Sequence, residues 1–511
     1  MKLSKILDLL EYRISEKNDI EISGISFSSN KINKGNLFIA VKGNTTDGAM
    51  FIDKAISNGA ASIIYDERSI INNDIKNLCI KNNIPILKVK NPEIEAARIS
   101  RLFYPNTPKN IYAVTGTNGK TTIANFTQQL LNLLGINDTA TIGTMGFNVS
   151  NSKFQKLSDE INLMIGKNPL TTQDTITNHK ILNMIANNGI NNLIMEASSD
   201  GIARHRLDEI NFTACAISNL STDHLITHGT MKDYLMVKMQ LFDKLPIGGT
   251  AIFNTDNEYS DQFKKYILNL NNSKNLDIIE YGKNVVDIQH GIKLQNYSYN
   301  NGKYDLEIIV FGTLYKTQLN LIGDFQIYNA LNALAFVLSD RSINVSKAVN
   351  AIKYLKTVNG RMELVATTKT GAKVYIDYAH NSEALKNALI QLRQITKNKL
   401  ISVSGISSGK STERYETAKI AGDLADIVIF TYLSPRSEDV NTIIEKQQKI
   451  YPQGLHGGKT RYDAIKKAID MAEDGDTILI NGQGHEKFII EYGKPVPFYD
   501  CDTIIKIISK S

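Results

Sequence analysis

The sequence predicts an α/β protein of three domains, with a central doubly wound sheet of the P-loop type and a Rossmann-like domain after it. Three observations predict this fold. The chain has 511 residues, enough for about two to four domains with sizeable cores. Short β-branched apolar runs alternate with helical segments, as in parallel sheets. A glycine-rich stretch, Ala113–Thr122 (AVTGTNGKTT), overlaps the end of the apolar run Ile111–Val114.

Apolar runs rich in Val, Ile and Leu, bounded by turn residues, mark the predicted strands. In the first and last thirds of the chain they are Leu37–Val41, Ala61–Tyr65, Val374–Tyr378, Ile401–Val403, Ile427–Tyr432 and Thr477–Ile480. The segment Phe51–Asn58 is predicted to be a helix that ends at Gly59.

Two prolines, Pro105 and Pro108, flank the entry into the glycine-rich stretch and mark a boundary. We therefore expect a domain at residues 1–105, a central domain at 106–342 and a third domain at 343–511.

Composition excludes several classes of function. The net charge of +6 is mild for this length, and no Lys/Arg block interleaved with aromatics occurs, so nucleic acid is not expected as a partner. Cys79, Cys215 and Cys501 lack C-x-x-C spacing, which favours small buried side chains in a reducing compartment over metal ligands. The N-terminal segment MKLSKILDLLEYRIS carries acids and lacks a signal-peptide pattern, and no apolar run reaches transmembrane length. We expect a cytoplasmic protein that does not bind membranes.

The glycine-rich stretch has the residue types of a phosphate-binding loop. Glycines permit unusual backbone conformations, and the turn amides and helix N-terminus attract an anion. Lys120 can reach the terminal phosphates of a nucleotide, and the Thr121 hydroxyl can bind Mg²⁺. Val114 stands where the common G-x-x-x-x-G-K-[ST] pattern has Gly, so the loop is a variant; the alternative is a chance glycine turn. The residues expected to bind ATP here are Gly116, Thr117, Asn118, Gly119, Lys120, Thr121 and Thr122.

A second element of this site is predicted at Asn192–Ser199 (NLIMEASS), a strand that ends in Glu196. In an open α/β sheet, a carboxylate at the carboxyl end of a strand beside the phosphate loop is placed to bind a metal ion. The alternative is that Glu196 caps a helix.

The loop TGTNGKTT resembles the ATP loop of the Mur ligases, which join an amino acid to a nucleotide-linked peptidoglycan precursor. Other motifs resemble those of MurE-type members, which add the third residue of the stem peptide. They are SSNKINKGNLF, LTTQD, NLSTDHLITHG, GRME, DYAH and NGQGHE. The resemblance covers nearly the whole chain; it is strong around the phosphate loop and patchy at both substrate ends.

The resemblance implies a catalytic set of Lys120, Glu196, His224 and Lys238. It implies two Mg²⁺ ions, one held by Thr121 and Glu196, the other by Glu196, His224 and a carbamate that Lys238 forms with CO₂. Lys238 lies among apolar residues of a predicted helix. The alternative interpretation is that Lys238 is an ordinary surface lysine whose aliphatic stem packs on these apolar neighbours.

Further residues take roles from the same motifs. The resemblance implies ATP contacts at Asn329, Arg361 and Asp377. It implies acceptor contacts at Ser28, Thr171, Thr172, Ser198 and Arg206. It implies contacts to the incoming amino acid at Arg414, Arg436, Gly482 and Glu486. For the motif NGQGHE, which contains Gly482 and Glu486, the alternative is an ordinary strand-to-helix turn.

The chain departs from the family pattern at its substrate ends. Ser28 replaces an Asp, Asp200 replaces a His, and Leu433 and Ser434 replace an Asp-Asn pair. The acidic glycine loop before Arg414 is lost. These changes leave open a ligase of another pathway that acts on a different carboxylate.

The sequence therefore predicts ATP-driven amide-bond formation through an acyl phosphate. We expect the acceptor to be UDP-N-acetylmuramoyl-L-alanyl-D-glutamate and the protein to be a monomer. Diaminopimelate is favoured over lysine, because Arg414 and Arg436 could each bind a carboxylate; alternatively, Arg436 pairs with Glu438 or Asp439. A nucleotide-binding scaffold without ligase activity is the alternative of a different class, and the retained catalytic set argues against it.

Overall fold

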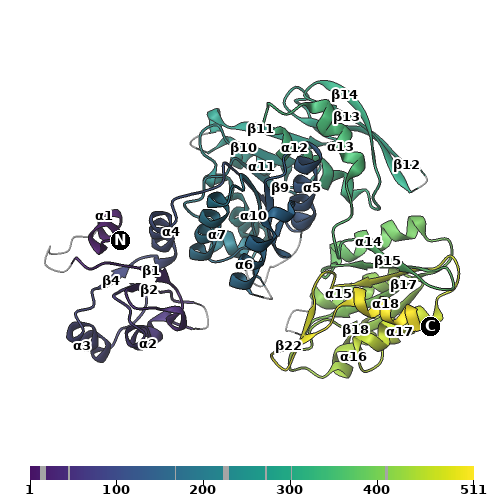
Figure 1. Cartoon of the computed structure of the whole chain (residues 1–511). Coiled ribbons are helices and arrows are strands. Elements are labelled where there is room, and N and C mark those ends of the chain that lie inside the picture. The colour runs from purple at the N-terminus through teal and green to yellow at the C-terminus, as the bar shows by residue number, and fades with distance from the viewer. Residues whose placement is uncertain are drawn as a thin grey trace.

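A computed structural model of the chain shows three α/β units in sequence order (Figure 1). It describes residues 1–11, 19–43, 46–166, 169–221, 229–270, 273–300, 302–408 and 413–510. Within these residues, no helix combines the length and the apolar character needed to cross a membrane.

The N-terminal unit is a four-stranded parallel sheet with helices around it. Its strands are β1 (Gly24–Ser26), β2 (Asn36–Ala40), β3 (Ser62–Asp66) and β4 (Ile86–Val89). Its helices are α1 (Leu3–Leu9), α2 (Ile52–Ser57), α3 (Asn73–Lys81) and α4 (Pro92–Phe103). The two strands and the helix predicted here are confirmed as β2, β3 and α2.

The central unit has a ten-stranded sheet in the order β14-β13-β12-β11-β10-β9-β5-β8-β6-β7. Its strands are β5 (Asn110–Thr115), β6 (Thr139–Gly143), β7 (Gly146–Val149), β8 (Asn192–Glu196), β9 (Ala214–Ile217), β10 (Thr250–Asn254), β11 (Asp277–Gly282), β12 (Ile292–Asn300), β13 (Lys303–Val310) and β14 (Thr313–Leu319). Strand β5 pairs in parallel with β8 on one side and β9 on the other. The chain therefore builds the sheet outward from β5 on both sides, with β8 and β6 on one side and β9 and β10 on the other. Open α/β sheets bind ligands at the strand where the order reverses in this way.

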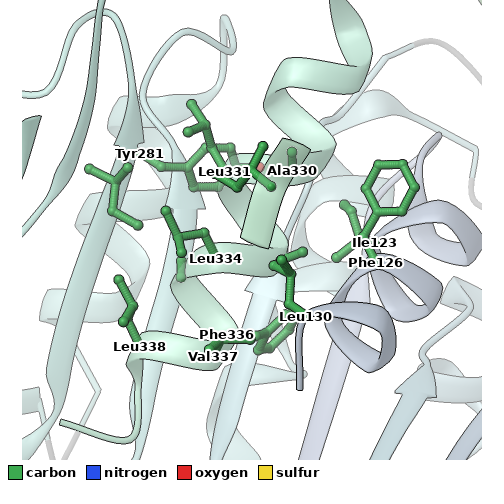
Figure 2. Packing of buried hydrophobic residues seen from close by; sticks show 14 of the residues in the cluster. Ile123, Phe126, Leu130, Tyr281, Ala330, Leu331, Leu334, Phe336, Val337 and Leu338 are labelled. Atoms are coloured by element: carbon green, nitrogen blue, oxygen red, sulfur yellow. The ribbon is translucent and has the colours of Figure 1, made fainter. Parts of the chain in front are cut away.

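Helices cover both faces of the parallel part of this sheet, so strands such as β5, β8, β9 and β10 are buried almost throughout rather than alternating. They are α5 (Lys120–Leu133), α6 (Gln155–Ile165), α7 (Thr175–Asn187), α8 (Ser199–Ala203), α10 (Met231–Met239), α11 (Ser260–Leu268), α12 (Phe325–Leu338) and α13 (Val345–Ala351). Figure 2 shows the core between α5 and α12, with Ile123 and Phe126 of α5 on the right and Leu331, Leu334 and Leu338 of α12 to the left of them; all belong to one buried cluster. Every residue of α12 except Phe325 and Tyr328 is buried, and α12 shares one core with α5.

Two features of this unit differ from expectation. Strands β12–β14 form an antiparallel extension that the sequence analysis did not identify. Helix α13 and the following residues through Val358 pack in the same core as α5 and α12. The packing therefore places the passage into the next unit near Gly360, later than the predicted boundary at residues 342–343.

The C-terminal unit has a six-stranded sheet in the order β15-β16-β20-β17-β18-β19, with β15 antiparallel to its neighbour. The strands are β15 (Glu363–Thr367), β16 (Lys373–Asp377), β17 (Leu400–Ile406), β18 (Ile427–Tyr432), β19 (Leu455–His456) and β20 (Thr477–Asn481). The helices are α14 (Ser382–Ile395), α15 (Glu413–Leu424), α16 (Val440–Ile450), α17 (Arg461–Met471) and α18 (Asp500–Lys510), and a hairpin joins β21 (Phe488–Glu491) to β22 (Lys494–Pro497). All four strands predicted here are confirmed, as is the three-domain α/β architecture.

Candidate functional site

A cavity of about 700 Å³ lies between the central and C-terminal units. The central unit contributes the phosphate loop, Glu196, Lys238 and Asn329 to its walls. The C-terminal unit contributes Arg361 together with residues from the end of β16 and the start of α14. The cavity therefore collects the carboxyl ends of parallel strands from two sheets, where polar side chains and loop amides meet.

The phosphate loop is built where neighbouring chain leaves no room for side chains. Gly116 has φ 139° and Gly119 has φ 88°, both in the region that favours glycine. A Cβ at Gly116 would overlap the Ser218 hydroxyl, and one at Gly119 would lie 2.6 Å from Asn329 Oδ1. The close packing explains why both positions need Gly, and it places Asn329 against the loop that α5 follows.

Two lysine ammonium groups converge on this loop. Lys120 Nζ donates to the carbonyl oxygens of Gly116 at 2.9 Å and Thr117 at 3.0 Å. Lys238 Nζ donates to the same Gly116 carbonyl at 2.9 Å and lies 4.4 Å from the centre of the Tyr234 ring. Lys238 is 1% exposed, so it is not the surface lysine of the alternative interpretation. Two cations beside one loop suit a ligand with several negative charges.

Glu196 lies at the carboxyl end of β8 and is 4% exposed. Its Oε2 accepts from the Thr121 hydroxyl at 3.0 Å and from the Thr144 hydroxyl at 3.1 Å, and its Oε1 accepts from the Thr144 amide at 3.0 Å. Ser198, not Glu196, caps α8. This carboxylate and the Thr121 hydroxyl are hard oxygen donors of the kind Mg²⁺ prefers, so the residues fit a magnesium ion. His224, the remaining predicted ligand, lies outside the described residues.

Arg361 reaches across from the C-terminal unit. Its Nη2 lies 3.4 Å from the Thr121 hydroxyl and its Nη1 lies 3.4 Å from Nδ1 of His485. Its guanidinium stacks on the Tyr378 ring, 4.3 Å from the centroid. Tyr378 in turn donates its hydroxyl to Glu486 Oε1 at 3.0 Å. A continuous set of contacts therefore joins Glu486 to the Thr121 hydroxyl.

Burial sets the protonation of this cluster. It raises the pKa of the Glu486 carboxyl, against the effect of the Tyr378 hydroxyl. Burial, with the Arg361 charge second, lowers the pKa of His485 to about 4, so this imidazole is neutral at pH 7. Burial also raises the pKa of Asp377, although its carboxylate accepts from the amides of Met362 at 2.6 Å and Ala379 at 2.7 Å.

Asn118 of the phosphate loop also contacts the C-terminal unit. Its Nδ2 donates to Glu383 Oε2 at 3.1 Å, and its Oδ1 accepts from Asn381 Nδ2 at 3.3 Å. These contacts come from the start of α14. They hold the two walls of the cavity together at the loop itself.

The residues predicted to bind the acceptor divide into two places. Thr171 and Ser198 line the cavity; the Thr171 hydroxyl lies 3.0 Å from that of Thr144. Thr172 is buried beside them and donates its hydroxyl to the Glu196 carbonyl at 2.9 Å. Arg206 Nη1 donates to the Thr172 carbonyl at 3.0 Å. Ser28 belongs to the N-terminal unit and is not among the residues that line this cavity.

Arg206 is also paired with Asp200, one of the positions where the chain departs from the family pattern. Its Nη2 lies 3.0 Å from Asp200 Oδ2, and Arg204 Nε lies 2.8 Å from the other oxygen. Asp200 lines the cavity. The Asp200 carboxylate therefore pairs with one nitrogen of the Arg206 guanidinium, which is predicted to contact the acceptor.

The residues predicted to bind the amino acid follow three neighbouring strands of the C-terminal sheet. Gly482 follows β20 and donates its amide to the Asp377 carbonyl at 2.8 Å. Arg436 follows β18, is exposed and has φ 55°. The alternative interpretation is that Arg436 pairs with Glu438 or Asp439. In the structure Glu438 pairs with Lys446 instead, and Asp439 caps α16. Arg414 lies in α15, but its side chain is outside the described part of the structure.

Sequence reasoning missed three residues of this site. Tyr378 and His485 stand inside the quoted motifs DYAH and NGQGHE, so their motif membership was an available signal. Thr144 directly follows the end of β6, which lies next to β8 in the sheet. Its position at the carboxyl end of a strand was a weaker signal of the same kind.

The lowered pKa of His485 predicts a pH-dependent stability. Because the folded-state pKa of about 4 lies below the ordinary 6.5, the unfolded chain binds the proton more readily. The stabilisation from the neutral imidazole is present above about pH 6.5 and is lost as the pH falls toward 4. In His485→Asn, this dependence should be absent. Urea unfolding of both proteins at pH 7.5 and pH 5 should show a wild-type advantage that shrinks at pH 5; an equal difference at both values would contradict the assignment.

Three family models together match most of the chain. The Mur ligase family, catalytic domain, matches residues 21–114; the Mur ligase middle domain matches 114–337; and the Mur ligase, glutamate ligase domain, matches 360–484. The last match begins at Gly360, where the packing places the passage into the C-terminal unit.

Curated relatives match over nearly their whole length. The UDP-N-acetylmuramoyl-L-alanyl-D-glutamate–2,6-diaminopimelate ligase of Agrobacterium fabrum is 32% identical over 97% of this chain and 95% of its own. The protein of the same name from Brucella melitensis is 34% identical over 98% of this chain and 96% of its own. The UDP-N-acetylmuramyl-tripeptide synthetase 2 of Oceanobacillus iheyensis is 32% identical over 94% of this chain and 93% of its own.

Solved structures show the same fold. A UDP-N-acetylmuramoyl-L-alanyl-D-glutamate–2,6-diaminopimelate ligase superposes with a TM-score of 0.64 at 24% identity, over 100% of this chain and 99% of that one. The MurF ligase of Thermotoga maritima in complex with ADP superposes with a TM-score of 0.58 at 18% identity, over 97% and 99%. With three family models in order and relatives above 30% identity across the whole chain, this protein belongs to the Mur ligase family.

Proposed function

We propose that this protein is an ADP-forming ligase of peptidoglycan synthesis that adds 2,6-diaminopimelate to UDP-N-acetylmuramoyl-L-alanyl-D-glutamate. One observation carries the proposal: a phosphate loop with two lysines and a buried carboxylate faces Arg361 from the next domain across one cavity. The names of the relatives supply the substrates. A ligase acting on a different carboxylate is the second candidate, favoured by the pairing of Asp200 with Arg206.

In the first step a carboxylate oxygen of the acceptor attacks the γ-phosphorus of ATP. A new O–P bond forms, the bond to the β,γ-bridging oxygen breaks, and ADP leaves. Lys120 and Arg361 would stabilise the charge on the phosphoryl group as it transfers, the dominant catalytic contribution in this chemistry. The family resemblance assigns Asn329 to adenine and Asp377 to the ribose, and both residues line the cavity.

In the second step the amine of diaminopimelate, having lost a proton, attacks the acyl carbon. The C–N bond forms, the C–O bond to phosphate breaks, and inorganic phosphate leaves. Phosphorylation is needed because a carboxylate oxygen is otherwise a poor leaving group. Glu486 and Gly482 would bind the ammonium end of the amino acid. The contacts from Glu486 through Tyr378 to Arg361 support an amino-acid site adjacent to the phosphates.

Magnesium fits this site as described above. Thr121 and Glu196 would hold one ion, while Glu196, His224 and a carbamate of Lys238 would hold a second, and the ions would neutralise phosphate charge. The carbamate would form when the Lys238 ammonium loses one proton and its nitrogen adds to CO₂ with loss of a second, making an N–C bond. Lys238 is 1% exposed and its Nζ lies 2.9 Å from the Gly116 carbonyl oxygen, which supports a carbamate beside the phosphate loop.

Thr171, Thr172, Ser198 and Arg206 would contact the muramoyl dipeptide, and Ser28 the uridine nucleotide in the N-terminal domain. We expect the protein to be a monomer. The free cysteines support a reducing compartment, consistent with a cytoplasmic location.

Lys120→Ala tests the assignment of the phosphate site. Loss of this cation should reduce ADP release in the presence of acceptor and diaminopimelate by about 10²–10³, as for removal of one preorganised stabiliser. Lys347→Ala, at an exposed lysine on α13, is the matched control and should leave the rate unchanged. Unaltered ADP release in Lys120→Ala would refute the site.

Arg436→Glu tests the choice of amino acid. A guanidinium binds a distal carboxylate through parallel donors, and its replacement by a carboxylate should repel that group. Kinetics with diaminopimelate and lysine should show a much larger loss of kcat/KM for diaminopimelate. A strong wild-type preference for lysine, insensitive to this substitution, would move the proposal to the second candidate.

A further inference from the structure

Arg461 and Asp500 form an ion pair whose side chains have 0% exposure. Arg461 is the first residue of α17, and Asp500 is the first residue of α18. The pair is bidentate, with Nε 2.8 Å from Oδ1 and Nη2 2.7 Å from Oδ2. A fully buried guanidinium is costly to desolvate, so its position calls for an explanation other than stability alone.

The same guanidinium touches the ends of two strands and passes close to a third. Its Nη2 donates to the Asn481 carbonyl, the last of β20, at 3.1 Å, and its Nη1 lies 3.4 Å from the Tyr432 carbonyl, the last of β18. Between these strands lies β17, where a Cβ at Gly405 would lie 3.0 Å from Nη1. The Arg461 guanidinium therefore lies next to the carboxyl ends of three adjacent strands, β20, β17 and β18.

Two of these strands lead into loops that carry the proposed amino-acid site. Strand β18 leads to Arg436, and β20 leads to Gly482 and Glu486; residues 409–412, between β17 and Arg414, lie outside the described residues. Leu433, directly after β18, packs against the Cα of Gly482, where a Cβ would lie 2.6 Å from Leu433 Cδ1. A shift of one strand end would therefore move several of the proposed contacts relative to one another.

We infer that Arg461, held by Asp500, is a positioning residue that keeps the loops after β18 and β20 in the register required to bind the incoming amino acid. The inference rests on the proposed function. Arginine is needed because its planar fork presents donors in several fixed directions at once. Lysine keeps the charge but concentrates its donors on one nitrogen, so it cannot hold Asp500 and both carbonyls together.

The test is steady-state kinetics of Arg461→Lys in the full chain, with ATP, acceptor and diaminopimelate varied in turn. Misplacement of binding groups by about 1 Å can cost up to about 10² in rate. We expect KM for diaminopimelate to rise at least about tenfold, with KM for ATP and for the acceptor changed less than about twofold.

A second variant, Gly405→Ala, keeps both charged residues of the ion pair. Its added methyl group would press on the guanidinium, on Leu433 and on the Tyr432 carbonyl carbon, all 3.0 Å away, without a charge change. It should raise KM for diaminopimelate by a smaller factor, about threefold. This variant also covers the case in which Arg461→Lys does not fold.

The matched control is Arg393→Lys, at the opposite edge of the same sheet. Arg393 pairs with Asp426 at 2.7 Å and donates to the Leu424 carbonyl at 3.0 Å, beside the amino end of β18. It should leave all three KM values unchanged, because the loops of the site lie at the other edge.

Three outcomes would overturn the inference. The fraction of molecules that bind ADP measures how much of each variant is folded. If Arg461→Lys and Gly405→Ala lower kcat only in proportion to that fraction, with KM for diaminopimelate unchanged, the ion pair is merely structural. If Arg393→Lys raises KM for diaminopimelate equally, the effect is general to the domain. If Glu486→Gln raises KM for diaminopimelate while Arg461→Lys and Gly405→Ala do not, the amino-acid site stands and the positioning role is wrong.

An unchanged KM for diaminopimelate in Glu486→Gln would instead refute the proposed amino-acid site, on which the inference rests.

Discussion

The close packing around Gly116 is the constraint on which the rest of this site depends. Its Cα faces the Ser218 hydroxyl with no room for a side chain, and its carbonyl accepts from the ammonium groups of both Lys120 and Lys238. Two cations held at one backbone oxygen repel each other unless anions lie near, and the Glu196 carboxylate lines the same cavity. A phosphate chain would supply the others. The loop is therefore arranged for a ligand with several negative charges.

The second sheet completes the site through contacts that only tertiary structure can provide. Arg361 lies across the cavity from the phosphate loop, and the start of α14 contacts Asn118. Because Arg361 stacks on Tyr378 and Tyr378 binds Glu486, the phosphate end and the amino-acid end share one set of contacts. Domain closure in enzymes commonly assembles catalytic groups in this way, and excludes water from a reactive intermediate.

Local sequence signals predicted eight strands, because buried parallel strands appear as continuous apolar runs; they are β2, β3, β5, β8, β16, β17, β18 and β20. The buried strands β9 and β10 were not identified. The phosphate loop and Glu196 were also found from the sequence, since each depends on one strand and the turn after it. Residues whose role depends on which strands are neighbours were missed. Thr144 bonds Glu196 only because β6 lies beside β8, and Arg461 lies beneath three strand ends far apart in the chain. The antiparallel strands β12–β14 were missed because their alternating burial gives a weaker apolar signal.

The central claim is that the acceptor carboxylate is activated by transfer of the γ-phosphoryl group at this cavity. The most direct measurement uses acceptor labelled with oxygen-18 in its glutamyl carboxylates, incubated with ATP and diaminopimelate, followed by mass analysis of the products. The account predicts transfer of one labelled oxygen to inorganic phosphate for each amide bond formed, with ADP as the nucleotide product. Label in AMP, or none in inorganic phosphate, would contradict it.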